Sequence, residues 1–272
     1  MAVSDPAHAA HDPRILAVVN QKGGVGKTTT AINLGTALAA VGRSVLIVDL
    51  DPQGNASTGL GVAVRDRELS TYDLMMGQAT LKAVMVETSV PRVSITPGSV
   101  ELSGVDIELV ALADRTHKLK AALDCPEGRQ FDYILIDCPP ALNLLTVNAM
   151  VAANAVLVPL QCEFFALEGL SQLLKTIEKI KLSLNTTLKI EGILLTMFDK
   201  RNNLSAQVAE DVRETLGDVV FKTIIPRNVR LSEAPSHAVP ALIYDHSCAG
   251  SQAYMHLAGE VLRRNMDLEV LA

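Results

Sequence analysis

The sequence predicts an α/β protein in which a single doubly wound, mostly parallel sheet is flanked by helices. Short apolar runs rich in β-branched residues alternate with longer helical patterns, which is typical of parallel strands connected by helices. Hydrophobic residues make up 49% of the 272 residues, but aromatic residues only 3%. A core made of Val, Ile, Leu and Ala suits strands that helices bury on both faces.

Six apolar runs are expected to form the main strands. The run "RILAVVN" at 14–20 comes first, "SVLIVDLD" at 44–51 ends in two aspartates, and "YILIDCPP" at 133–140 is stopped by its prolines. Each run has the length and the aliphatic composition of a strand buried inside a sheet. The later strands are expected at 155–161, 189–199 and 219–226.

Helical patterns fill the segments between these strands. The first helix is expected at 28–41, where Ile32, Leu34 and Leu38 are available for burial on one side. Further helices are expected at 166–181, 202–216 and 250–264. Residues 62–130 are the least regular part of the chain and are expected to hold helices around one strand near "VSITPG".

The same pass along the chain indicates one domain. No internal repeat, low-complexity tract or linker interrupts residues 14–265, so we expect them to form a single domain. Residues 1–13 are expected to be a disordered N-terminal tail, and residues 266–272 a C-terminal tail.

Composition excludes several classes of protein. No apolar run is long enough to span a bilayer, and the first residues lack the basic and apolar regions of a signal peptide. The four cysteines are scattered without a C-x-x-C pair, which argues against a zinc site or a disulfide framework and favours the reducing cytoplasm. The net charge of −6 means that any contact with DNA requires a local basic patch.

The segment "NQKGGVGKTTT" at 20–30 is the strongest functional signal. It ends like a phosphate-binding loop of the pattern G-x-x-x-x-G-K-[ST], but Gln21 stands where the first glycine belongs. Glycines let such a loop turn its N–H groups toward phosphate oxygens, and the next helix adds its positive end. The expected nucleotide-binding residues are Lys22, Gly23, Gly24, Val25, Gly26, Lys27, Thr28 and Thr29.

Individual roles follow from this pattern. Lys27 is expected to reach the β- and γ-phosphates, and the Thr28 hydroxyl is expected to hold Mg²⁺. Asp137 ends an apolar strand and matches the carboxylate that holds Mg²⁺, usually through water. Asp51 is expected to position the attacking water and is also a candidate metal ligand. Asp49 points the same way if the strand persists, but it can instead stabilise the loop.

A second lysine, Lys22, stands at the other end of the loop. Because Lys27 already serves the phosphates, another cation in the same subunit is redundant. An exposed lysine at the entrance can instead reach across an interface to the nucleotide of a second molecule, as an arginine finger does in trans. The alternative is a solvated surface lysine.

Five segments together resemble the ParA/Soj family of chromosome and plasmid partitioning ATPases, which carry a deviant Walker A motif. They are "KGGVGKTT", "DLDPQGNASTGLG", "DYILIDCPP", "PLQCEFFALEGL" and "IIPRNVRLSEAPSHA", and the resemblance covers residues 14–265. It implies ATP and Mg²⁺ as ligands and a fold like those of MinD and the nitrogenase iron protein.

The resemblance also implies roles for particular residues. Lys22 would contact the partner's phosphates in an ATP-bound sandwich homodimer, and Asp51 would support hydrolysis. Pro226, Arg227 and Asn228 match the segment beside the adenine. The family binds double-stranded DNA without sequence preference, and Arg201 of "DKRNN" and Arg230 of "PRNVR" match its DNA-contacting positions.

A ParB-type centromere-binding partner and an association with the nucleoid in the cytoplasm are implied in the same way. Two alternatives remain open, a MinD-like ATPase and a ParA-like ATPase with another cargo. A third, an electron donor like the nitrogenase iron protein, is set aside because the four cysteines show no cluster spacing. A MinD-like membrane ATPase needs a basic amphipathic helix at its C-terminus, whereas here Arg263 and Arg264 are followed by Asp267 and Glu269, so no stable membrane association is expected. A ParA-like ATPase can also position protein clusters or other cargo.

Overall fold

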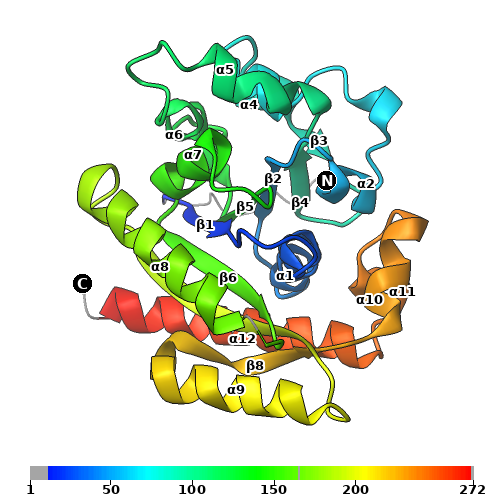
Figure 1. Cartoon of the computed structure of the whole chain (residues 1–272). Helices are drawn as coiled ribbons and strands as arrows, with labels where there is room; N and C mark the ends of the chain where they lie inside the picture. Colours follow the sequence, from blue (N-terminus) through cyan, green and yellow to red (C-terminus); the bar gives the residue numbers. More distant parts are fainter. Residues whose placement is uncertain (1–11, 165, 271–272) are drawn as a thin grey trace.

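A twisted sheet with eight strands forms the centre of the computed structural model, which describes residues 12–164 and 166–270 (Figure 1). The strands lie in the order β3-β4-β2-β5-β1-β6-β7-β8, and all neighbouring pairs are parallel except the antiparallel pair β3 and β4. Their bounds are β1 Arg14–Val18, β2 Val45–Asp49, β3 Val86–Glu87, β4 Val93–Thr96, β5 Tyr133–Asp137, β6 Ala155–Gln161, β7 Lys189–Phe198 and β8 Val220–Pro226.

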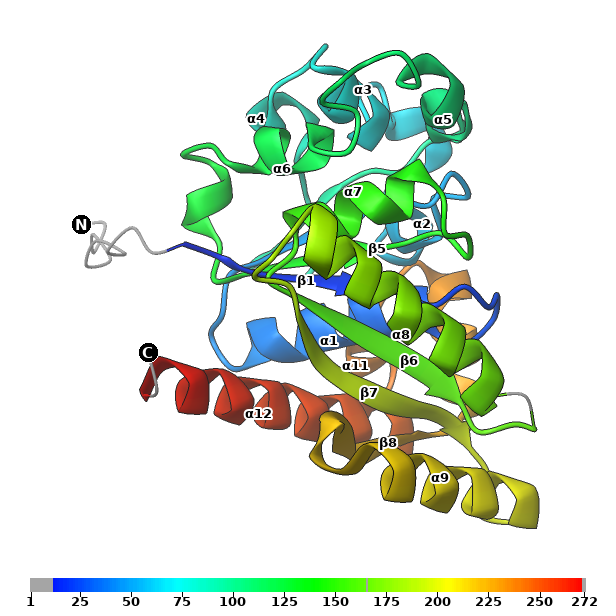
Figure 2. The ribbon, with the colours of Figure 1, turned by 60° about the vertical axis from the view of Figure 1, so that its left-hand side comes forward.

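Successive side chains of the central strands point into two separate cores, as the period of a strand requires. In β1, Leu16 and Val18 face one core while Ala17 faces the other. Figure 2 shows the resulting layers, with α1 and α12 on one side of the sheet and α7 and α8 on the other. The first core is packed by α1 (Lys27–Ala40), α2 (Asn55–Gly59) and α12 (Ala249–Val270).

The second core is covered by helices from two parts of the chain. The long helices are α7 (Leu144–Ala152), α8 (Ala166–Ser183) and α9 (Asn203–Leu216). The short ones are α3 (Thr71–Met76), α4 (Leu81–Val84), α5 (Val105–Glu108) and α6 (Lys118–Leu123). Two more short helices, α10 (Val229–Glu233) and α11 (Ala241–Tyr244), lie between β8 and α12 in sequence.

The expected α/β class, the six main strands and the long helices are confirmed. Several strands end two or three residues early, because the chain turns into loops at the carboxyl edge of the sheet. The last helix continues to Val270, so most of the segment assigned to a C-terminal tail is helical instead. Residues 1–11 of the expected N-terminal tail lie outside the described residues.

The strand order explains where a site can form. β1 lies between β5 and β6, and the connections place β2 to β5 on one side of it and β6 to β8 on the other. At such a reversal the loops diverge and leave room for a ligand beyond the carboxyl ends of the strands. The loops after β1, β2 and β5 all open at this edge.

Candidate nucleotide-binding site

The phosphate loop connects β1 to α1 at the carboxyl edge of the sheet. Gly24 and Gly26 have φ angles of +76° and +91°, a conformation that residues with a Cβ rarely adopt. The first turn of α1 is closed by the Thr30 N–H, which donates to the Gly26 carbonyl at 2.8 Å. The N–H groups that precede Thr30 have no partners within the helix, so they are available to phosphate oxygens.

Three side-chain hydrogen bonds hold this loop on the elements around it. Asn20 Nδ2 donates to a carbonyl of β6 at 2.7 Å, and Gln21 Nε2 donates to a carbonyl of α8 at 3.2 Å. From β7, Thr196 Oγ1 donates to the Val25 carbonyl at 2.9 Å. Gln21, which replaces the usual first glycine, therefore serves to anchor the loop.

Lys27 is a buried cation inside the loop. Its ammonium donates to the Lys22 carbonyl at 2.9 Å, and its side chain is almost inaccessible to solvent. Burial lowers the pKa of Lys27, while the nearby Asp137, Cys138 and Asp51 oppose that shift. An ammonium that has lost its water is poised to gain strongly from an anion that enters the loop.

Asp137 carries the clearest sign of a cation-binding site. Its carboxylate is fully buried, and neither oxygen has a hydrogen-bond partner within the described part of the chain. Burial raises the pKa of Asp137 well above its usual value, and Asp49 adds to this; the Thr28 hydroxyl nearby lowers it without satisfying either oxygen. Buried unpartnered carboxylate oxygens are rare, and hard divalent cations prefer such ligands. Thr28 and Asp137 thus fit Mg²⁺, the latter through water.

The two aspartates after β2 have different surroundings. Asp49 accepts hydrogen bonds from the Ser57 N–H and hydroxyl at 2.8 and 2.6 Å and from the Asp51 N–H at 3.3 Å. Burial raises the pKa of Asp49 to about 6, although these hydrogen bonds oppose it. Asp51 is 7% exposed, and one of its oxygens accepts from the Gln53 N–H at 2.9 Å. Asp49 therefore stabilises the loop, whereas Asp51 retains a free acceptor.

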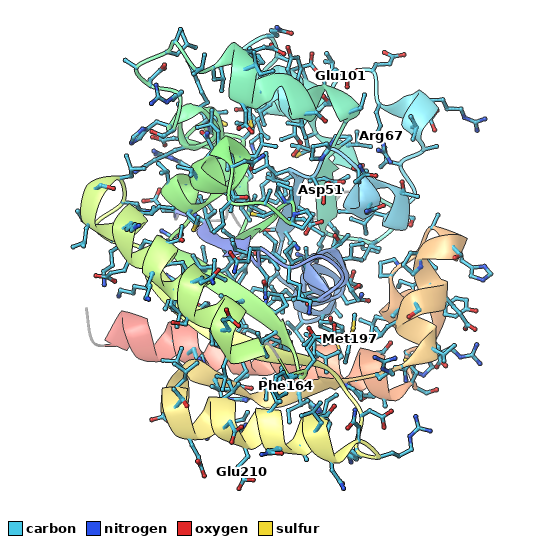
Figure 3. The ribbon with its side chains drawn as sticks, viewed as in Figure 1. Asp51, Arg67, Glu101, Phe164, Met197 and Glu210 are labelled. Atoms are coloured by element: carbon cyan, nitrogen blue, oxygen red, sulfur yellow. The ribbon has the colours of Figure 1, made fainter. Side chains whose placement is uncertain are left out.

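Arg67 holds the backbone of the segments next to these aspartates, a role that no sequence motif indicated. Its guanidinium donates to the carbonyls of Gly54, Val62 and Gly98 and to the Thr58 hydroxyl, at distances between 2.8 and 3.2 Å. Gly98 packs so closely that a Cβ there would come within 2.8 Å of atoms of both aspartates. Figure 3 shows Arg67 on the side of α2, near Asp51. Arg67 thus fixes the loop that carries Asp51.

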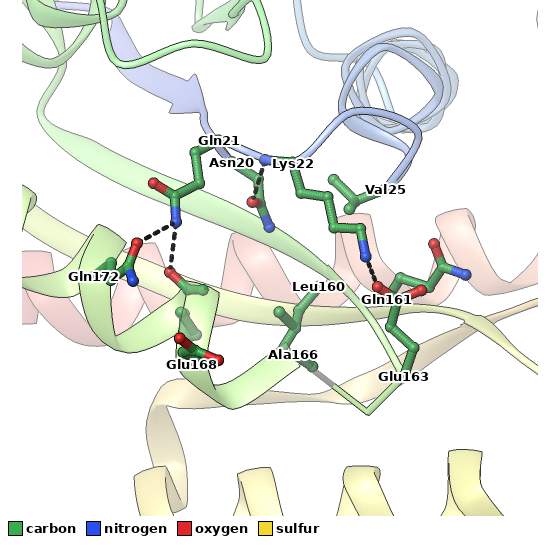
Figure 4. Close-up of a pocket in the computed structure, with 12 residues that line it drawn as sticks. Asn20, Gln21, Lys22, Val25, Leu160, Gln161, Glu163, Ala166, Glu168 and Gln172 are labelled. Atoms are coloured by element: carbon green, nitrogen blue, oxygen red, sulfur yellow. Dashed lines mark hydrogen bonds and ion pairs between the residues drawn. The ribbon is translucent and has the colours of Figure 1, made fainter.

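Lys22 lies at the entrance of the loop, beside a cavity of about 340 Å³ that the loop shares with α8. Its ammonium forms an ion pair with Glu163, which follows β6 (Figure 4). The Lys22 side chain is 51% exposed and that of Glu163 is 32% exposed. Such an exposed pair is easily exchanged for another partner, because water screens it.

A second cavity, of about 370 Å³, opens beyond the start of α1. Gly26 and Thr29 line it from the phosphate loop and α1, and Pro226, Arg227 and Asn228 line it from the end of β8. The Arg227 N–H donates to a carbonyl at the end of β7 at 2.9 Å, and the Asn228 side chain caps α10. The volume is in the range of small-ligand pockets.

Arg201 and Arg230 lie at the same edge, after the neighbouring strands β7 and β8. Arg201 forms an ion pair with Asp199 at 2.8 Å, and its side chain is 88% exposed. Arg230 pairs with Glu233 at 2.8 Å and lies 3.5 Å from Asp245. Both cations are accessible, but each already has a carboxylate partner.

The structure therefore brings some of the expected site residues together beside the phosphate loop and places the others at its margins. Asp137 and Asp51 lie near enough to Lys27 to oppose the lowering of its pKa by burial, and Thr28 lies near enough to Asp137 to oppose the raising of that carboxyl's pKa by burial, so these four residues gather beside the phosphate loop. The segment 226–228 lines the adjoining cavity, Lys22 flanks the loop on the other side, and the two arginines lie further out on the surface.

Known proteins are similar to this chain in sequence and in fold. A family model described as an AAA domain matches residues 13–190. The chromosome partitioning protein ParA of Caulobacter vibrioides is 57% identical over 265 residues, which cover 97% of this chain and 99% of that protein. The sporulation initiation inhibitor protein Soj of Bacillus subtilis is 51% identical over 248 residues, which cover 91% of this chain and 98% of that protein.

A solved structure is similar over most of the chain as well. Cobyrinic acid a,c-diamide synthase from Mycobacterium smegmatis, with bound ADP and magnesium, superimposes with a TM-score of 0.81 and 37% identity, over 92% of this chain and 94% of that one. The fold and the phosphate loop define a P-loop protein of the α/β class. Within this class, the chain belongs to the ParA/Soj family of partitioning ATPases.

The structure also bears on the two more distant alternatives. Within residues 12–164 and 166–270, no helix has the length and apolar character needed to cross a membrane. Arg264 donates to three backbone carbonyls and lies over the Phe221 ring, so it is not free for lipid. Cys138 and Cys162 are buried, whereas a cluster that bridges two subunits needs thiols at the surface between them.

Proposed function

We propose that this protein is an Mg²⁺-dependent ATPase that segregates DNA, binding it without sequence preference as an ATP-bound dimer and releasing it after hydrolysis. The observation that carries the proposal is the buried, unpartnered carboxylate of Asp137 beside Lys27, Thr28 and the phosphate loop. Membership of the ParA/Soj family supports the cellular role, because relatives named for chromosome partitioning match nearly the whole chain.

The residues of the site divide the work of hydrolysis. The loop N–H groups and Lys27 bind the phosphate oxygens, and Thr28 and Asp137 would hold Mg²⁺. The cation would neutralise charge on the β- and γ-phosphates. Asp51, with its free acceptor, orients a water molecule for attack, and Asp49, Ser57 and Arg67 keep it in place. The adenine occupies the cavity beside 226–228.

The remaining parts of the proposal concern partners. Two subunits sandwich two nucleotides, so that Lys22 of each leaves Glu163 and contacts the phosphates bound to the other. A ParB-type protein stimulates hydrolysis, and the protein works in the cytoplasm on nucleoid DNA. The exposed Lys22 ion pair supports this cycle, because its exchange for a phosphate contact is inexpensive in water.

We expect Lys22→Ala to bind ATP as a monomer but to fail to dimerise. Lys22 is exposed and is not needed to close the loop around phosphate, yet the partner's nucleotide would lose its contact in trans. Light scattering with a non-hydrolysable ATP analogue measures the dimer directly. Lys175→Ala, an exposed lysine on α8, is the matched control and should dimerise normally. If the Lys22 variant dimerised normally, Lys22 would have no role in dimerisation and would be only a charged surface residue.

We expect Arg230→Ala to weaken DNA binding to a similar degree on unrelated sequences. Two arginines per subunit, Arg201 and Arg230, give roughly four phosphate contacts per dimer and a log–log salt slope of about −3 to −4. The variant should flatten the slope by about two. ATPase activity without DNA should persist, because the side chain pairs with Glu233 and Asp245 and not with a residue of the phosphate loop.

Binding of labelled duplexes to the ATP-locked dimer, measured over a range of salt concentrations, checks this expectation. Arg263→Ala is the matched control, since Arg263 is an exposed arginine near the end of α12, away from the nucleotide edge. Failure of the wild-type ATP-bound dimer to bind any duplex would overturn the proposed role in DNA segregation. An unaltered salt slope in the Arg230 variant alone would move the DNA-binding patch elsewhere.

A further inference from the structure

Met197 has a backbone conformation that its side chain disfavours. Its φ angle is +51°, and it is one of three non-glycine residues with positive φ within the described part of the chain. It lies near the end of β7, where the register with β8 shifts between Leu195 and Phe198. Strained residues of this kind persist where the surrounding structure holds them, and they gather at ligand sites.

Hydrogen bonds on both sides of Met197 hold this conformation. The preceding residue, Thr196, donates its hydroxyl to the Val25 carbonyl of the phosphate loop at 2.9 Å. The following residue, Phe198, accepts a hydrogen bond from the Arg227 N–H at 2.9 Å. Met197 is therefore placed between the phosphate loop and the segment 226–228 by contacts that do not involve its own side chain.

The side chain of Met197 is half-buried in the wall of the cavity of about 370 Å³. Gly26 and Thr29 line this cavity together with Asn228, so it adjoins the phosphate loop. Figure 3 shows Met197 next to α1. Leu231 and Ile225 make much of the remaining lining apolar.

We propose that Met197 contacts the nucleotide base and is a determinant of specificity for adenine over guanine. The inference rests on the proposed ATP site. A thioether is polarisable and packs well against the faces and edges of aromatic rings, but it is at most a weak hydrogen-bond acceptor. Guanine has more polar groups on its ring than adenine, and desolvating them against this wall is unfavourable.

In Met197→Gly, the relief of backbone strain should preserve stability, whereas the loss of the base contact should weaken ATP binding. Met197→Gly removes both the base contact and the disfavoured conformation, because glycine adopts positive φ readily. The protein without nucleotide should then keep its melting temperature within about 2 °C, since relief of strain offsets the lost packing. ATP affinity should fall at least tenfold. Met197→Ala retains the strained backbone and should lose ATP affinity to a similar extent.

The experiment measures the dissociation constants of ATP and GTP, with Mg²⁺, for the wild type and both variants, together with melting temperatures without nucleotide. The two nucleotides carry the same phosphates, so GTP is the internal control for the phosphate loop. GTP affinity should change less than threefold, which lowers the preference for ATP at least threefold. The matched control is Met255→Ala, a half-buried methionine of α12 outside the cavity. It should lower the melting temperature without altering either dissociation constant.

The outcomes separate this inference from the proposed function. If the wild type binds no ATP, both fall. If the wild type binds ATP and both Met197 variants bind it equally well, only the role of Met197 is overturned. Equal losses for ATP and GTP would also overturn it, because they would indicate a general collapse of the cavity. A drop in the melting temperature of Met197→Gly like that of Met255→Ala would make Met197 a packing residue.

Discussion

Lys27→Ala should weaken ATP binding at least about 30-fold and leave the nucleotide-free protein about as stable as the wild type. The ammonium of Lys27 is buried, and burial lowers its pKa although Asp137 and Asp51 lie nearby, so holding the charged form there carries a desolvation cost that an entering phosphate would offset. Removing it relieves that cost while it loses one hydrogen bond to the Lys22 carbonyl. Truncating one partner of a buried charge pair costs about 2–5 kcal/mol, so ATP affinity should fall roughly 30-fold to several thousand-fold.

Melting curves with and without ATP test both halves of this expectation. At a nucleotide concentration of about 100 times the wild-type dissociation constant, the wild type gains about 2.7 kcal/mol, and in Lys27→Ala this gain should fall below about 1 kcal/mol. Lys175→Ala, which removes an exposed lysine, should retain it. Unchanged ATP affinity in Lys27→Ala would contradict the assignment of the phosphate loop itself.

The strands that carry the site could be predicted because each is a short aliphatic run with a sharp polar end. "YILID" became β5, and Asp137 at its end lies where parallel strands open toward a ligand. The pairing of Asp49 with Asp137 across β2 and β5 was not predictable from either run alone. It depends on the register between two segments that are far apart in the chain.

The elements within residues 62–130, the least regular part of the chain, could not be predicted individually, and the reason is physical. Helices α3 to α6 have four to six residues each, which is too short for a helical period to appear in a sequence window. The antiparallel strand β3 has only two residues. Such short helices are stabilised by their packing against the rest of the protein and not by their own sequence.

Contacts made by single side chains over long distances were also missed. Arg67 sits in the irregular segment without a motif, and only its hydrogen bonds to Gly54 and Gly98 reveal that it fixes the loop of Asp51. The ion pair of Lys22 with Glu163 and the strained backbone of Met197 are likewise properties of the fold. The signal that could have suggested this ion pair is the single acidic residue that closely follows the strand in "PLQCEFF", Glu163.

Asp51→Ala should bind ATP as the wild type does and lose hydrolysis, so that the ATP-bound dimer accumulates. Asp51 is nearly buried, yet one carboxylate oxygen has no hydrogen-bond partner within the described residues. Asp49 cannot replace it, because both of its oxygens accept hydrogen bonds from Ser57 or Asp51. Removing a group that orients or deprotonates the attacking water typically slows turnover about 100- to 10,000-fold.

Asp51→Asn distinguishes this chemical role from a structural one. The amide oxygen can still accept the hydrogen bond from the Gln53 N–H, which holds the loop, but the side chain no longer carries charge. Both substitutions should therefore abolish turnover in a phosphate-release assay, while equilibrium binding of ATP changes little. If only the alanine variant lost activity, the contribution of Asp51 would be to hold the loop through Gln53. Turnover at the wild-type rate in both variants would transfer the role to Asp49, and Asp49→Asn would then be the inactive one.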